Sequence, residues 1–144
     1  DAYMVPMDEE MDHVRDYLEL EQARFEEKLI VSYDVPEHMD IEIPTLILQP
    51  IVENAVRYGI NREGKRIVSI QAKEAEDGYL VWIRDEGKGI EEEILGKLLS
   101  GKAIGNSIGL SNVHKRMKSN YGEEYGLHIV SSAEGTCVEL HFIR

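Results

Sequence analysis

Residues 79–90 read Tyr-Leu-Val-Trp-Ile-Arg-Asp-Glu-Gly-Lys-Gly-Ile, a strand pattern followed directly by a glycine-containing turn. Apolar side chains occupy both alternating faces at the start of this stretch. The pattern therefore predicts a strand over 79–85 at the centre of a sheet. Asp85 ends this strand, and Gly87 and Gly89 then permit a tight turn and a close approach of the backbone to a ligand.

The segments on either side of this stretch extend the sheet and add helices. A strand over 67–75 is joined to the central strand through Glu76-Asp77-Gly78, which predicts a hairpin because Asp-Gly tolerates positive φ. This order of elements predicts a two-layer α/β sandwich. Apolar periodicity predicts helices over 8–28, 46–58, 91–99 and 108–121, strands over 29–35 and 39–43, a loop over 100–107, and a closing hairpin of 127–131 and 137–143.

The composition indicates one acidic domain. The chain has 144 residues, the length of a single domain, and its hydrophobic share of 42% is enough for a buried core. Its 16 Lys and Arg against 28 Asp and Glu leave a net charge of −12, which argues against nucleic acid as a partner, because phosphate backbones are bound by clustered cations. No apolar run approaches the ~20 residues that span a bilayer, and the single Cys137 excludes an internal disulfide. Because the chain begins at Asp1 rather than Met, we expect it to be part of a longer protein.

The helix over 46–58 carries the first group of candidate ligand residues. A buried amide such as Asn54 needs partners, and a Mg²⁺ ion with its waters and phosphates supplies them. Arg57 lies one turn further, where its charge can meet phosphate. The alternative is a solvated polar face stabilised by an ion pair between Glu53 and Arg57. The residues that share this polar face are Pro50, Asn54, Arg57 and Asn61.

Two glycine-containing turns carry the other candidates. The Asp85 carboxylate only accepts hydrogen bonds, so it can recognise an amino group such as that of adenine. Residues 105–110 run into a helix, and backbone N–H groups at a helix start bind phosphate. The alternatives are a polar strand-to-helix turn after Asp85 and a turn in which Ser107 caps the helix. The spacing matches neither the dinucleotide-binding fingerprint nor the P-loop.

The order and spacing of these motifs resemble the Bergerat (GHKL) ATP-binding fold shared by gyrase, heat-shock chaperones, histidine kinases and mismatch-repair proteins. Three phrases, at residues 17–25, 43–59 and 108–117, are similar to the catalytic domain of sensor histidine kinases of the LytS/YesM type. The resemblance covers almost the whole chain. It implies a mixed, mostly antiparallel sheet covered on one face by helices, and a protein-histidine kinase that uses ATP and Mg²⁺.

The resemblance also implies a role for each candidate residue. Asn54 coordinates the Mg²⁺ that bridges the phosphates, and Arg57 stands where the family has a basic residue near phosphate, which makes it the candidate catalytic residue. Tyr58 flanks the nucleotide, and Asp85 accepts a hydrogen bond from the adenine amino group. The remaining residues are implied to shape the pocket floor (Gly87, Gly89 and Ile90), to form the end of an ATP lid (Gly105, Ser107, Ile108, Gly109 and Leu110) and to support the water network of Asp85 (Thr136).

Two positions depart from the family pattern. Ser107 replaces the middle glycine of the usual lid loop, and its Cβ makes a positive φ costly there. Pro50 occupies the position where the hydrolysing relatives place a general-base Glu, one turn before Asn54. Glu53 lies about 100° round the helix from Asn54 and is a poor substitute. This favours phosphoryl transfer to another residue over attack by water.

The resemblance divides the chain into a linker and a catalytic domain. Residues 1–28 are expected to be the C-terminal end of a dimerisation helix or, equally, an amphipathic helix lying on a core, and residues 29–144 to be the histidine-kinase-like ATPase domain. None of the five histidines fits the family's phosphoacceptor, so we expect this histidine to lie on a dimerisation domain absent from the chain. The chain's own histidines are expected to be surface or satisfied core residues.

The implied partners are that dimerisation domain, a response regulator and a second copy of the full-length protein. The resemblance places the catalytic domain in the cytoplasm, in a membrane-anchored sensor. The isolated fragment is expected to bind ATP without phosphorylating itself. Two alternatives stay open: a serine kinase of the anti-sigma type with the same ATP fold, and a degenerate nucleotide-binding module that signals without kinase activity.

Overall fold

The computed structural model describes residues 3–103 and 105–144, apart from the side chain of Asn106. Its helices are α1 (Met7–Phe25), α2 (Gln49–Tyr58), α3 (Glu92–Leu99) and α4 (Ile108–Tyr121), with short 3-10 turns η1 (Glu26–Lys28), η2 (Gly105–Ser107) and η3 (Glu123–Tyr125). Its strands are β1 (Met4–Pro6), β2 (Leu29–Asp34), β3 (Glu42–Pro44), β4 (Arg66–Ala75), β5 (Gly78–Asp85), β6 (His128–Ser132) and β7 (Gly135–Ile143). None of the helices in the described ranges is both long enough and apolar enough to cross a membrane.

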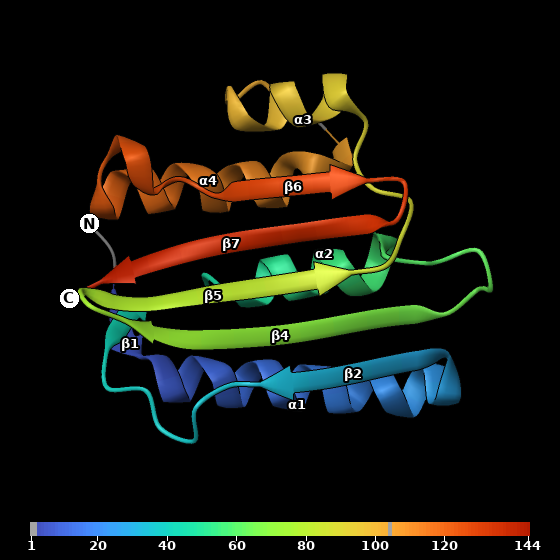
Figure 1. Cartoon of the computed structure of the whole chain (residues 1–144), viewed down its shortest axis with the longest axis horizontal. Coiled ribbons are helices and arrows are strands. Elements are labelled where there is room, and N and C mark those ends of the chain that lie inside the picture. Colours follow the sequence, from blue (N-terminus) through green and yellow to red (C-terminus); the bar gives the residue numbers. More distant parts are fainter. Residues whose placement is uncertain (1–2, 104) are drawn as a thin grey trace.

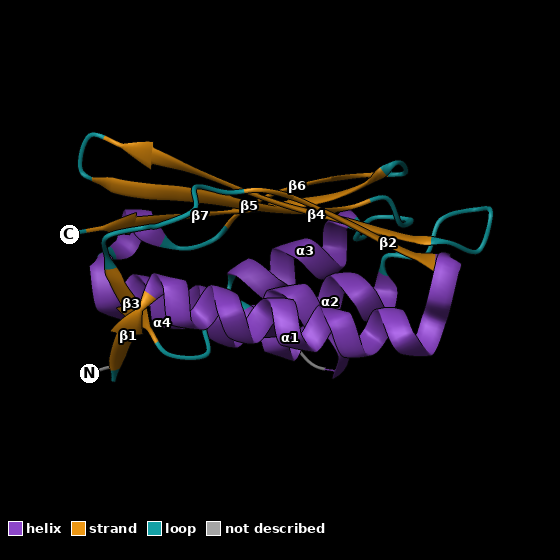
Figure 2. Cartoon of the chain, turned by 90° about the horizontal axis from the view of Figure 1, so that it is seen from below, coloured by secondary structure: helices purple, strands orange, loops and turns teal. Residues whose placement is uncertain are grey.

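Five strands form the main sheet, in the order β2-β4-β5-β7-β6 (Figure 1). β2 runs parallel to β4, and the other neighbouring pairs are antiparallel. β5 lies at the centre, as the apolar residues on both of its faces predict. Seen along its edge, the sheet carries the helices on one face, and β1 pairs with β3 as a separate ladder on the same side (Figure 2). The predicted two-layer sandwich with a mixed, mostly antiparallel sheet is therefore confirmed.

The hydrophobic core lies between the sheet and the helices. Buried and half-buried positions alternate along β4 and β7, so that one row of side chains meets the helices. This packing favours the interpretation of the first helix as an amphipathic helix lying on the core, whereas the division of the chain at residue 28 stays a prediction. The residues of α1 that join the core are Met7, Met11, Val14 and Leu18.

The short segments before α2 differ from the sequence prediction. The strand expected over 39–43 is reduced to β3, and its partner β1 was not predicted at all. Strands of three residues carry too little alternation to be recognised in a sequence. α2 begins at Gln49 rather than at residue 46, because residues 45–48 form a turn in which Leu46 has a φ of 54°.

The predicted hairpin of β4 and β5 is confirmed, but for a reason other than the expected one. Ala75 pairs with Gly78 across the turn formed by Glu76 and Asp77. Gly78 does not adopt a positive φ. Instead, a Cβ on Gly78 would lie 1.9 Å from the main-chain oxygen of Phe142 on β7, so the close approach of the neighbouring strand requires glycine here.

Candidate functional site

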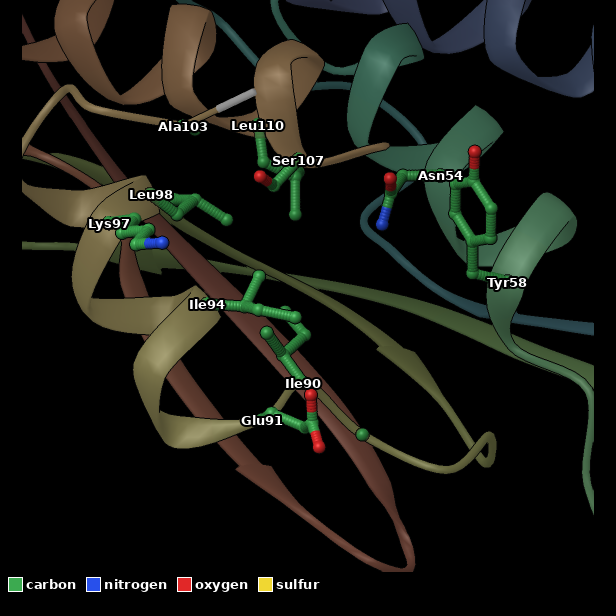
Figure 3. Close-up of a pocket in the computed structure, with 11 residues that line it drawn as sticks. Asn54, Tyr58, Ile90, Glu91, Ile94, Lys97, Leu98, Ala103, Ser107 and Leu110 are labelled. Atoms are coloured by element: carbon green, nitrogen blue, oxygen red, sulfur yellow. The ribbon is translucent and has the colours of Figure 1, made fainter. Parts of the chain in front are cut away.

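A cavity of about 570 Å³ opens between α2, α3, the turn after β5 and the start of α4 (Figure 3). This volume is within the range of small-molecule sites. Of the predicted site residues, the lining includes Asn54, Tyr58, Gly89, Ile90, Ser107 and Leu110. The other lining residues are Glu91, Ile94, Lys97, Leu98 and Ala103.

α2 presents Asn54 to the cavity. The apolar face of this helix packs into the core, and Asn54 is half-buried on the other side with its amide directed into the cavity (Figure 3). The amide makes no hydrogen bond with a residue in the described ranges. Tyr58, one turn further, lines the cavity and is 41% exposed. Arg57 is exposed and lies outside the described lining, with its guanidinium carbon 5.9 Å from the ring centroid of Tyr58.

Asp85 ends β5, directly before the turn that lines the cavity, and neither Asp85 nor Gly87 is part of the described lining. The Oδ1 of Asp85 accepts a hydrogen bond of 2.9 Å from the N–H of Gly87. A Cβ on Gly59, the residue after α2, would lie 2.6 Å from the Cβ of Asp85, so the end of α2 packs directly against this side chain. Burial raises the pKa of the Asp85 carboxyl, and hydrogen bonds from the backbone of Gly87 and Thr136 partly offset the rise.

A pair of hydroxyl groups, those of Ser131 and Thr136, holds the turn after β5, and only Thr136 belongs to a predicted site motif. The N–H of Ile90 donates to Ser131 Oγ over 2.7 Å, and this oxygen lies 2.8 Å from Oγ1 of Thr136. Thr136 therefore supports Asp85 through its backbone and the cavity wall through Ser131. The predicted closing hairpin already brought these two residues close together, and this register was the signal that could have revealed Ser131.

Two of the predicted lid residues, Ser107 and Leu110, line the cavity. A helix turns by about 100° per residue, so adjacent residues of its first turn cannot all face the same cavity. Ile108, for example, is 49% exposed. The lid residues outside the described lining are Gly105, Ile108 and Gly109.

The loop before α4 avoids the strain that Ser107 was expected to introduce. Ser107 has a φ of −93°, so its Cβ is unstrained. The positive φ values fall on Gly101 and Gly105 instead. Replacing the middle glycine of the family pattern by serine is thus compatible with this backbone. Ile104, which belongs to the predicted lid loop, lies outside the described residues.

α3 supplies a wall of the cavity that is not among the predicted site residues. Ile94 and Leu98 lie one turn apart and face the cavity, and Lys97 brings the one positively charged side chain of the described lining (Figure 3). Leu98 is fully buried. The sequence signal that could have revealed this wall is the apolar pair Ile94 and Leu98, spaced by four residues in a short helix that directly follows the Asp-x-Gly-x-Gly turn.

The described residues contain no group of three or more His, Cys, Asp or Glu that could hold a metal ion. A Mg²⁺ ion here would take the Asn54 oxygen together with phosphate and water oxygens, which is how this ion commonly binds at phosphate sites. The one carboxylate of α2, that of Glu53, accepts a hydrogen bond of 3.0 Å from Gln49 and is not part of the described lining. This arrangement agrees with the expectation that Glu53 is a poor general base.

Sequence comparison finds an ATPase family and several sensor kinases that are similar to this chain. Residues 39–144 match the family described as histidine kinase-, DNA gyrase B-, and HSP90-like ATPase. Sensor histidine kinase YpdA of Escherichia coli is 40% identical over 137 residues, which cover 94% of this chain and 24% of that protein. Sensor protein LytS of Oceanobacillus iheyensis is 36% identical over 143 residues, which cover 94% of this chain and 24% of that protein. The chain thus spans about a quarter of the length of these relatives.

Solved structures share the fold. Histidine kinase AdeS of Acinetobacter baumannii aligns with a TM-score of 0.75 at 16% identity, covering 99% of this chain and 68% of that one. Histidine kinase ThkA, solved in complex with the response regulator TrrA, aligns with a TM-score of 0.67 at 16% identity, covering 96% of this chain and 40% of that one. The resemblance to LytS/YesM-type kinases is confirmed by the sequence relatives. The chain belongs to the family of histidine kinase-, DNA gyrase B-, and HSP90-like ATPases.

Proposed function

We propose that this domain binds Mg²⁺-ATP in the 570 Å³ cavity and donates the γ-phosphoryl group to a histidine on a dimerisation domain of the same protein. The observation that carries this proposal is the amide of Asn54, which faces the cavity without a hydrogen-bond partner among the described residues. The amide therefore keeps its oxygen and its N–H groups available in the cavity, where a ligand or metal ion can take the place of water. Membership of an ATPase family supports ATP as that ligand.

The residues around the cavity fit a nucleotide. Ile90, Ile94 and Leu98 offer apolar surface for a base, and Asp85, just before this wall, is an acceptor for the adenine amino group. Lys97 lines the cavity, where its ammonium group can meet phosphate charge. The Asn54 oxygen would hold Mg²⁺, which supplies neutralisation of the phosphate charges. Arg57 is a further cation close to the mouth, beside Tyr58.

Transfer to a side chain is favoured over hydrolysis by the composition of α2. Pro50 can accept no proton, and the carboxylate of Glu53 is hydrogen-bonded to Gln49 outside the described lining. α2 thus offers the cavity no base that could activate water. The contribution of these residues would be to position the nucleotide and stabilise its charge, as in phosphoryl transfer generally.

The proposed partners are the protein's own dimerisation domain with the phosphoacceptor histidine, a second copy of the full-length protein and a response regulator. The relatives named sensor histidine kinases support a phosphoacceptor histidine as the target, and the complex of ThkA with TrrA supports the response regulator. The dimerisation domain and the second copy follow from the family resemblance alone. We place the domain in the cytoplasm, in a membrane-anchored sensor. The case for a degenerate module rested on Ser107, and the φ of −93° at this residue removes that argument.

Isothermal titration calorimetry on Asn54→Ala tests the proposal. Wild type is expected to bind ATP more tightly with Mg²⁺ than with EDTA, and the variant to lose this difference while keeping its thermal unfolding transition. Asn120→Ala, which changes an exposed amide near the other end of α4, is the matched control and should behave as wild type. A Mg²⁺ dependence that survives in Asn54→Ala would contradict the assignment, and the absence of ATP binding by wild type would refute the proposed function.

A further inference from the structure

The turn between β3 and α2 is held by a buried carboxylate from α1. Glu10 is 1% exposed, and its two oxygens accept hydrogen bonds from three consecutive backbone N–H groups. The donors are Leu46 at 3.0 Å, Ile47 at 2.9 Å and Leu48 at 3.0 Å. Glu10 therefore satisfies the N–H groups that precede the start of α2, where the helix dipole also favours negative charge.

The carbonyl groups of the same turn are bound by a side chain from α4. Arg116 donates to the oxygen of Leu46 over 2.9 Å and to that of Thr45 over 2.6 Å. Leu46 has a φ of 54° although it is not a glycine, and it is 53% exposed, so its own burial does not enforce this conformation. Backbone strain of this kind persists only where the surroundings over-determine it. Glu10 and Arg116 provide that constraint.

The turn continues into α2 through one residue. Leu48 gives its N–H to Glu10, and its carbonyl oxygen accepts from the N–H groups of Ile51 and Val52, each at 3.1 Å. A chain of hydrogen bonds therefore runs from α1 through the turn into the first turn of α2. Asn54 lies on the next turn of this short helix, so the place of its amide in the cavity depends on where the helix begins.

We propose that Glu10 is a positioning residue for the metal-binding amide of Asn54. By holding the start of α2, the carboxylate sets the height and rotation of the helix relative to α3 and α4, which form the other walls of the cavity. A displacement of α1 would reach Asn54 through the same hydrogen bonds. The inference rests on the proposed function, because Asn54 matters only if a phosphate-bound Mg²⁺ occupies the site.

Glu10→Gln tests the inference, because it keeps the size of the side chain but turns one acceptor into a donor that faces N–H groups. Without nucleotide, hydrogen exchange of the amides at 46–52 is expected to become faster. In calorimetry, the gain in ATP affinity on adding Mg²⁺ is expected to fall about tenfold, the effect of losing roughly one hydrogen bond to a charged group. Adenosine affinity should stay within about twofold, because Glu10 holds the start of α2, whereas Asp85 packs against the opposite end of this helix and is held by the turn after β5.

Glu9→Gln is the matched control. Glu9 is the exposed neighbour of Glu10 on the same helix, and its replacement by Gln removes the same charge. It should change neither the hydrogen exchange at 46–52 nor the affinity for ATP.

If Glu10→Gln fails to fold, Arg116→Gln offers a second test, because it loosens the same turn from its carbonyl side. It is expected to reduce the Mg²⁺-dependent gain in ATP affinity without changing adenosine affinity. An unchanged Mg²⁺-dependent gain, or an equal loss of ATP and adenosine affinity, would overturn the inference. Absence of ATP binding by wild type would refute the proposed function instead, and the exchange data would still show whether Glu10 holds the turn.

Discussion

At the scale of single residues, Asp85 shows how packing prepares a side chain for recognition. The end of α2 packs against it at Gly59, and the N–H of Gly87 holds its Oδ1. Burial takes water away from the ionised carboxyl and raises its pKa. An ionised carboxylate is an acceptor only, so it complements the amino group of adenine and opposes the carbonyl group of guanine.

We therefore expect wild type to bind ATP at least about tenfold more tightly than GTP, because a buried mismatched polar group costs ~1–3 kcal/mol. Binding uses the ionised form of Asp85. ATP affinity should therefore be highest above the pKa of Asp85 and should fall as the pH drops through it. Because this pKa is raised, the fall should occur at a higher pH than for an ordinary aspartate. Calorimetry with both nucleotides over a pH series measures this. Asp85→Asn should abolish the preference for ATP over GTP. The control Asp77→Asn, in the exposed hairpin turn, should keep it. Equal affinities of wild type for ATP and GTP would exclude Asp85 as the residue that recognises adenine.

His114 is a second residue whose protonation depends on the fold. It is 6% exposed on α4, and its Nδ1 accepts a hydrogen bond of 2.9 Å from the N–H of Leu127. It is therefore a satisfied core histidine, one of the two kinds expected for the histidines of this chain. Burial lowers the pKa of its imidazole, and the charge of Lys118 lowers it further.

This lowered pKa makes the stability of the domain dependent on pH. The unfolded chain binds the proton more readily than the folded one, so the free energy of unfolding is largest above the unfolded pKa of about 6.5 and declines as the pH falls through it. His114→Gln keeps an acceptor for Leu127 but does not titrate, so its urea unfolding should vary less between about pH 7 and pH 5. His13→Gln, at an exposed site on α1, should retain the wild-type slope. An identical slope in His114→Gln would show that this residue is not responsible.

At the scale of elements, the segment between α3 and α4 is the proposed ATP lid. α3 ends at Leu99, and positive φ values at Gly101 and Gly105 shape the chain before it enters α4 at Ile108. The first N–H groups of α4 have no partner within the helix and can receive phosphate oxygens. A segment that must open for the nucleotide is drawn from the less stable parts of a fold.

We expect amide hydrogen exchange at residues 100–107 to be fast without nucleotide and to slow when Mg²⁺-ATP is present, together with the first turn of α4. Phosphate contacts would offset the conformational entropy that is lost when the segment is ordered. The strands of the main sheet serve as internal control, because their hydrogen bonds do not depend on the ligand. Slow exchange that ATP does not change would contradict the lid and would favour a module that signals without catalysis.

At the scale of the whole molecule, α1 is part of the core that holds the domain together. Burial of one large apolar side chain stabilises a fold by about 1.5–3 kcal/mol, so the side chains that α1 buries contribute on the order of the ~5–15 kcal/mol by which domains are stable. The same helix carries Glu10, which holds the start of α2. Stability and site geometry therefore depend on the same helix. The buried apolar side chains are Met7, Met11, Val14 and Leu18.

Deleting residues 1–25 should therefore abolish cooperative unfolding, because the sheet would lose the cover of α1 together with strand β1. Differential scanning calorimetry and near-UV circular dichroism measure this loss. A matched control is a full-length variant that replaces the exposed Leu20, 73% exposed on the same helix, by alanine, which should unfold like wild type. A cooperative transition in the truncated chain would instead support a domain that begins at residue 29.

Local pattern alone determined much of the fold. The central position of β5 followed from apolar residues on both of its faces, and α4 has the predicted bounds of residues 108–121, because a regular period over many residues marks an element without reference to the rest of the chain. These elements depend on neighbours in the sequence, which the sequence displays directly. The site roles of Asn54 and Ile90 come instead from the resemblance to the ATP-binding fold, and both residues line the cavity.

Tertiary structure decided which residues meet. It brought Lys97 and Leu98 of α3 to the cavity wall and left Arg57 outside the described lining, because facing a cavity depends on how helices pack rather than on their own period. It also joined Ser131 to the turn at Ile90. Above all, it buried Glu10 in a helix whose acidic first turn looks solvated in the sequence, since the N–H groups that stabilise this carboxylate belong to a turn 36 to 38 residues away.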